Sequence, residues 1–124
     1  MQRGFVRIAA ILGALAVILG AFGAHALKNL LTEQSLMIYE TGVRYQFYHT
    51  FALLITAILY KDFRGELLLW SGRLFILGIF LFSGSLYILA LWPEAKWIGP
   101  VTPIGGLFFI AGWIMMFMRL MKNR

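Results

Sequence analysis

Long apolar runs separated by short charged segments are the main pattern of this sequence. The four longest segments without Asp, Glu, Lys or Arg hold 20, 16, 20 and 22 residues and lie between Arg7 and Lys28, Arg44 and Lys61, Arg73 and Glu94, and Lys96 and Arg119. A helix needs about 20 apolar residues to cross the hydrocarbon core of a bilayer. The pattern therefore predicts four transmembrane helices, over residues 6–27, 44–60, 70–92 and 101–119.

The apolar runs favour helices over strands. Transmembrane barrel strands alternate apolar and polar residues, whereas residues 74–82 are apolar without alternation. A helix also satisfies its own backbone hydrogen bonds in lipid. We predict one all-α domain, residues 1–124, which is a four-transmembrane-helix bundle with an amphipathic outer segment, residues 32–44, between helices 1 and 2.

The outer segment carries the signals of a helix start. Thr32 can cap a helix, and Glu33 in the first turn suits the positive end of the helix dipole. Glu40 and Arg44 are spaced to form an i,i+4 ion pair. We expect a helix from about Ser35 that continues into the second span. The segment either lies in the membrane interface or covers the bundle.

A removable signal peptide is the alternative interpretation of the first run. Arg3 and Arg7 precede the run, and it ends with Ala24-His25-Ala26, which resembles a cleavage site. The apolar stretch is longer than the usual 7–15 residues of a signal core. We therefore favour a helix that stays in the mature protein.

Composition and charge place the chain in a membrane. Hydrophobic residues make up 61% of it and charged residues only 13%, against about 25% charged in soluble domains. The net charge is +6, but the cations flank the apolar runs, which is typical of a membrane protein and does not favour nucleic-acid binding.

The distribution of the cations predicts the orientation. With four crossings, eight Lys or Arg residues fall on the side of the two termini and three on the other side. Because cytoplasmic loops carry the excess of Lys and Arg, we predict that both termini are cytoplasmic.

Small residues recur within the predicted spans. Small side chains let membrane helices approach closely. The glycines expected at helix contacts are Gly13, Gly20, Gly23, Gly84, Gly105 and Gly106. A groove for a ligand would use the same residue types.

Polar residues are expected to gather near the outer ends of the spans. His25 and His49 are placed at similar depth on neighbouring helices. The candidate cluster is His25, Glu40, Arg44, Tyr45, Gln46, His49, Ser83, Ser85 and Thr102. Such a cluster could tie the helices together, or form a proton or ligand site.

Catalysis and metal binding are not expected. Two histidines without a third firm ligand make a weak zinc site, so neither a metal nor a cofactor is predicted. No acid or base lies in the middle of a span, and the sequence contains no catalytic arrangement of Ser, His and Asp. We predict that the protein is not an enzyme.

Four segments in order carry a resemblance to a known family. They are GAFGAHALK (20–28), YETGVRYQFYH (39–49), LFSGSLY (81–87) and TPIGG (102–106). Together they resemble the small membrane-protein family called domain of unknown function 423, also termed UPF 0382, which is similar to eukaryotic transmembrane protein 256. The resemblance implies a bacterial inner-membrane protein of four helices and no particular activity.

Two functions are compatible with these observations. The first is a structural or interaction protein of the cytoplasmic membrane that binds lipid or a partner helix. The alternative is a small oligomeric transporter or channel that uses the outer polar cluster. The expected partner is the lipid bilayer. A bound lipid and a homo-oligomer are left open.

Overall fold

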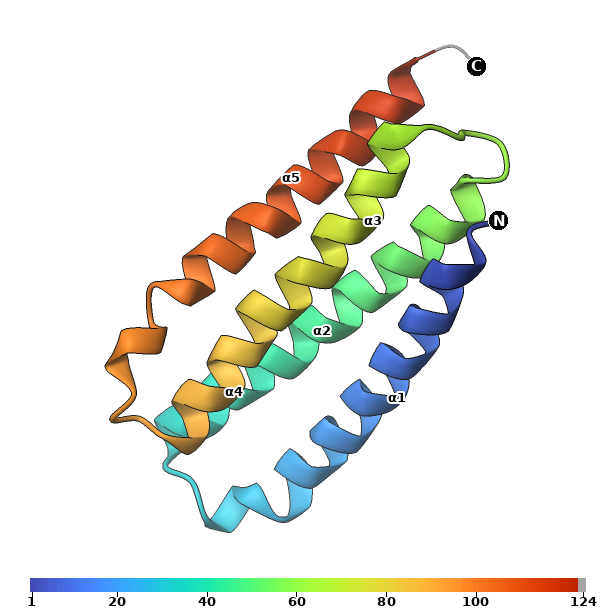
Figure 1. Cartoon of the computed structure of the whole chain (residues 1–124). Coiled ribbons are helices and arrows are strands. Elements are labelled where there is room, and N and C mark those ends of the chain that lie inside the picture. The colour runs from blue at the N-terminus through green and yellow to red at the C-terminus, as the bar shows by residue number, and fades with distance from the viewer. Residues whose placement is uncertain (123–124) are drawn as a thin grey trace.

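The computed structural model describes residues 1–122 and contains, over that range, helices but no strands (Figure 1). The helices are α1 (Arg3–His25), α2 (Glu33–Leu59), α3 (Glu66–Gly78), α4 (Gly84–Leu91) and α5 (Val101–Met121). A π-helical segment, Ile79–Ser83, joins α3 to α4 in one continuous rod. Short 3₁₀ turns, Leu27–Asn29 and Lys96–Ile98, follow α1 and precede α5. The predicted all-α class is confirmed.

The α2 helix and the α3–α4 rod form the centre of the bundle, with α1 and α5 on its flanks (Figure 1). The α1 helix packs mainly on α2, and α5 mainly on α3. The N-terminus, the α2–α3 connection and the end of α5 lie toward one end of the bundle (Figure 1). Successive rods, namely α1, α2, the α3–α4 rod and α5, are therefore antiparallel.

Three of the helical rods in residues 1–122 are long and apolar enough to cross a bilayer. They are Arg3–His25, Glu66–Leu91 and Lys96–Met121. The α2 helix is equally long, with 27 residues, but it is less apolar because polar side chains such as Gln46, His49 and Thr56 lie along it. These polar residues are buried in the bundle.

The expected amphipathic segment is the first part of α2. The Thr32 hydroxyl accepts a hydrogen bond from the Ser35 N–H at 3.1 Å, so the predicted cap is confirmed. The helix then runs without interruption to Leu59. The predicted Glu40–Arg44 ion pair does not form, because the Arg44 guanidinium donates to the Thr41 hydroxyl at 3.1 Å instead.

The α1 and α2 helices lie side by side along their full lengths. At one end the Gln2 N–H donates to the Ala57 carbonyl at 2.9 Å. Toward the other end the Tyr39 hydroxyl donates to the Leu19 carbonyl at 2.6 Å. The first part of α2 is thus part of the bundle and not a separate surface segment.

The glycines differ in how closely a neighbour approaches. A Cβ atom at Gly23 would overlap the Tyr39 ring, and one at Gly105 would lie 2.8 Å from the Phe82 Cα atom. Gly13 and Gly106 have only ordinary contacts, while nothing lies within 4 Å of a Cβ at Gly84. The expectation of close packing therefore does not hold at Gly84, which lines a cavity between the rod and α1.

Other glycines make close contacts with aromatic rings. A Cβ at each would collide with a ring of a neighbouring helix: Gly42 with Tyr87, Gly72 with Phe5, Gly78 with Phe109 and Gly112 with Phe75. At Gly42, α4 packs closely on α2 through the Tyr87 ring. The aromatic side chains thus fill the spaces that the missing Cβ atoms leave.

Serines on the central rod bond to backbone carbonyls of the neighbouring helices. Ser71 donates to the Gly112 carbonyl of α5, and Ser83 to the Gly42 carbonyl of α2, each at 2.7 Å. Both acceptors are glycines, whose lack of a side chain lets the hydroxyl reach the second lone pair of a carbonyl already bonded within its helix. These bonds set the register of the rod against both neighbours.

Candidate functional site

Gln46 joins three helices inside the bundle. Its amide nitrogen donates to the Leu12 carbonyl of α1 at 2.8 Å, and its oxygen accepts from the Tyr87 hydroxyl of α4 at 2.6 Å. The Gln46 side chain is buried. Because both ends of the amide are bonded to the protein, Gln46 acts as a structural link.

His49 is also fully engaged by the protein. The Trp113 indole N–H lies 3.1 Å from His49 Nε2, and the Tyr45 carbonyl oxygen lies 2.9 Å from Nδ1. An indole nitrogen can only donate, so Nε2 accepts and Nδ1 carries the proton that it donates to Tyr45. The Phe109 ring stacks on the imidazole at 3.5 Å. The imidazole is therefore held neutral, with no nitrogen free for a ligand.

The two histidines do not lie at similar depth, which corrects the expectation from the sequence. His25 ends α1 and is exposed. His49 lies half-way along α2, one residue from Thr50, which faces Gly13 in the middle of α1. The reason is that α2 begins at Glu33 and pairs with α1 from there, so His49 is far from the outer end.

The other predicted cluster residues are also dispersed. Ser83 bonds to α2, as described above, whereas Ser85 shares a hydrogen bond with Thr102 of α5. Tyr45 is partly exposed and packs against Phe82 and Phe109. Within residues 1–122, no three metal-ligating side chains of the His, Cys, Asp and Glu types come together. Of the predicted set, Glu40 and Arg44 border a common cavity.

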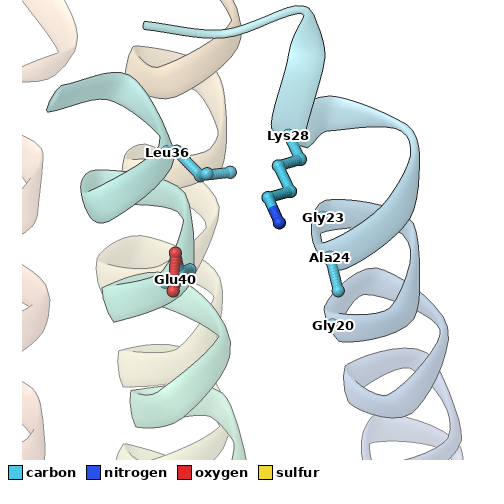
Figure 2. A pocket seen from close by; sticks show the side chains of 6 residues that line it. All are labelled: Gly20, Gly23, Ala24, Lys28, Leu36 and Glu40. Carbon is cyan, nitrogen blue, oxygen red and sulfur yellow. The ribbon is translucent and has the colours of Figure 1, made fainter. Parts of the chain in front are cut away.

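That cavity is one part of a groove between the C-terminal half of α1 and the first part of α2 (Figure 2). The part nearer the end of α1 has a volume of about 290 Å³ and is lined by Gly20, Gly23, Ala24, Lys28, Leu36 and Glu40. The adjoining part extends the groove along α2 to Tyr39, Val43 and Arg44. We call these residues the α1–α2 groove. Small residues of α1 form one wall, and side chains of α2 form the other (Figure 2).

The charged groups of the groove are not neutralised by one another. Neither Lys28 nor Arg44 lies within ion-pair distance of the Glu40 carboxylate, and among residues 1–122 the ion pair that forms is Arg73–Glu66. The Lys28 side chain extends into the space between the helices (Figure 2). The groove is thus lined by two cations and one anion, none of which is in an ion pair.

Arg44 lies below the end of α1. A Cβ at Gly20 would lie 3.4 Å from a Val43 methyl group, so Val43 and its neighbour Arg44 are level with Gly20. Gly20 is five residues before His25, the last residue of α1, which corresponds to about 7.5 Å of helix. Arg44 and Glu40 are therefore alongside an apolar part of α1, where an ionisable side chain is a functional-site hypothesis by default.

The sequence contains part of the signal for this groove. Gly20 and Ala24 are spaced i,i+4 on α1, and Glu40 and Arg44 have the same spacing on α2. Each pair therefore shares one helix face. The sequence does not reveal that the two faces meet or that Lys28 turns toward them, because these depend on the register of α1 against α2.

Comparisons with known proteins agree on one family. The profile of the family described as "Protein of unknown function (DUF423)" matches residues 19–106. A UPF0382 membrane protein of Staphylococcus haemolyticus is 43% identical over 90% of this chain and 93% of its own. The UPF0382 membrane protein YwdK of Bacillus subtilis is 41% identical over 98% of both chains. The UPF0382 inner membrane protein YgdD of Escherichia coli is 43% identical over 93% of this chain and 87% of its own. No solved structure matches.

Proposed function

The chain belongs to the DUF423 family of membrane proteins, and from this premise we propose that it is a non-catalytic protein of the bacterial cytoplasmic membrane that crosses the bilayer four times and holds a phospholipid in the α1–α2 groove. The observation that carries the proposal is the set of unpaired charges in a groove walled by small residues, alongside an apolar part of α1.

The packing of α2 supports four crossings. Its 27 residues correspond to about 40 Å of helix, longer than the roughly 30 Å of the hydrocarbon core. It also pairs with α1, an apolar span, from Ala57 to Tyr39. From Tyr48 to Ile58 the polar side chains His49, Thr50 and Thr56 are buried in the bundle, and the exposed side chains are apolar or aromatic.

Reporter fusions test the crossing of α2. A fluorescent reporter fused after Asp62 or at the C-terminus should be active in the cytoplasm, because Lys and Arg are concentrated at that end of the bundle. An alkaline phosphatase reporter fused after Asn29 or Glu94 should be active outside. If the fusions after Asn29 and Asp62 report the same side, α2 does not cross and the proposal fails.

The shape of the groove supports a lipid as its ligand. The groove is open along its side, because Ala24, Glu40 and Arg44, which line it at successive levels, are all exposed. In the proposed topology acyl chains surround this side, and Gly20, Gly23 and Ala24 leave room beside α1. Lys28, in the turn that follows α1, provides a cation at the outer end of the groove, and Arg44 provides a second cation deeper along it. Cationic side chains at membrane interfaces attract lipid phosphates.

Filling the groove should remove the lipid. Ala24 is exposed and lines the groove, whereas Ala21 is exposed on the same helix but is outside it. Ala24→Phe should reduce the phospholipid that co-purifies with the protein by several-fold, because the ring occupies the space. Mass spectrometry of extracted lipid measures this.

The matched control for Ala24→Phe is Ala21→Phe, which adds the same ring to the same helix. This variant should retain the wild-type amount of lipid. If both variants retain equal amounts, the groove does not hold the lipid.

The alternative function, an oligomeric transporter or channel, has no specific observation in its favour. It relied on a polar cluster near the outer surface, and the residues of that cluster are dispersed over the bundle. Gln46 and His49 have protein partners at every polar atom. Flux through proteoliposomes that disappears in His49→Ala would reinstate it.

A further inference from the structure

The geometry points to a phosphoethanolamine lipid as the occupant of the α1–α2 groove: its phosphate is bound by Lys28 and Arg44, and its ammonium group by Glu40. This inference rests on the proposed function and specifies the ligand. It commits to a lipid of the bilayer, because the groove opens sideways toward the membrane and not only at its end.

The pattern of charge in the groove is the first observation. Lys28 comes from the end of α1, Arg44 from the deeper part of α2, and Glu40 lies between them along the groove. A purely anionic headgroup would satisfy the two cations but would place a negative charge beside the Glu40 carboxylate. A headgroup with one negative and one positive charge complements all three side chains.

The availability of Glu40 is the second observation. It is one helical turn from Arg44, a spacing at which the two side chains often pair, yet Arg44 donates to Thr41 instead. Glu40 has no ion pair within residues 1–122, and Lys28 on the facing helix does not reach it either. Glu40 therefore lines the groove without an ion-pair partner of its own (Figure 2).

The chemistry of the ammonium group decides between zwitterionic lipids. A carboxylate forms short, strong hydrogen bonds with N–H groups that carry positive charge. The primary ammonium of phosphoethanolamine has three such N–H groups, whereas the quaternary ammonium of phosphocholine has none.

Lipid titration of the full chain in detergent, followed by native mass spectrometry, tests the inference. The probes are dioleoyl phosphatidylethanolamine, phosphatidylcholine and phosphatidylglycerol, which differ only in the headgroup. Phosphatidylethanolamine should bind about tenfold more tightly than either of the others, the difference expected for one charge-assisted hydrogen bond in a partly open site.

Single-residue variants separate the two parts of the headgroup. Glu40→Gln should abolish the preference for phosphatidylethanolamine over phosphatidylcholine while the chain still binds both. Lys28→Gln and Arg44→Gln should each weaken all three lipids several-fold, because all three contain the phosphate. The matched control is Glu94→Gln, which removes the same charge from an exposed connection outside the groove and should leave the preference unchanged.

The outcomes distinguish this inference from the function on which it rests. Equal binding of the three lipids, a preference for phosphatidylglycerol, or a preference that survives Glu40→Gln would overturn the headgroup assignment but leave lipid binding intact. Failure to bind any of the three would overturn both. A lipid-free dimer that Ala24→Phe converts to a monomer would also overturn both, because a second copy of the chain would then fill the groove.

Discussion

Gly105→Ala is expected to destabilise the protein by about 3 kcal/mol or more, at the upper end of what overpacking costs. The added Cβ would lie 2.8 Å from the Phe82 Cα atom and closer still to the Phe82 backbone nitrogen. These are main-chain atoms of the π-helical segment, so no side-chain rotation can relieve the overlap. The α5 helix would have to move away from the central rod. Unfolding of the purified protein in detergent, followed by circular dichroism, measures the loss.

The neighbouring glycine provides the control for Gly105→Ala. A Cβ at Gly106 would lie 3.8 Å from the nearest ring atom of Phe82, which is an ordinary contact. Alanine is also favoured over glycine within a helix by up to about 1 kcal/mol. Gly106→Ala should therefore be as stable as the wild type or slightly more stable. Equal stability of the two variants would contradict the close approach of α5 to Phe82.

Gln46→Leu should lower the stability by about 2 kcal/mol, because it leaves the half-buried Tyr87 hydroxyl without its acceptor and removes the bond to α1. An unsatisfied buried polar group costs about 1–3 kcal/mol, although hydrogen bonds between membrane helices often contribute less, about 0.6 kcal/mol on average. The same unfolding measurement in detergent applies.

A double-mutant cycle isolates the bond between the two side chains. Tyr87→Phe removes the donor, and the double variant Gln46→Leu/Tyr87→Phe removes both partners. The double variant should be more stable than the sum of the two single effects predicts, by about 1 kcal/mol, because neither partner is left unsatisfied. Strictly additive effects would mean that the bond does not contribute to the folded state in the membrane mimetic.

The packing of Phe82 shows why the difference between Gly105→Ala and Gly106→Ala could not be predicted from the sequence. The run around Phe82 is apolar and predicts only a helix in lipid. The π-helical segment places its main chain against Gly105, whereas Gly106, which is identical in type and adjacent in sequence, has free space. Whether a glycine is required depends on the rotation of its helix relative to its neighbour.

The candidate site could likewise be predicted only in part from the sequence. Glu40 and Arg44 were identified from their residue type and position, and the structure places both beside one groove. His25 and His49 were grouped because each was assumed to lie near the outer end of its span. That assumption was wrong because α2 already packs on α1 at Tyr39, before the predicted start of the span at residue 44, and this longer pairing places His49 in the middle of the bundle.

The sequence by itself determined the properties that depend only on neighbouring residues. The lengths of the uncharged runs indicated helices in a membrane, and Thr32 marked the start of α2. The tertiary structure decided which glycines are closely packed, that Gln46 and His49 are enclosed, and that Lys28, Glu40 and Arg44 border one groove. The physical reason is that helix formation is governed by local backbone bonding and burial in lipid. Contacts between helices depend instead on the register and rotation of each helix. Register and rotation are selected by hydroxyl, amide and glycine contacts between residues that are distant in the sequence.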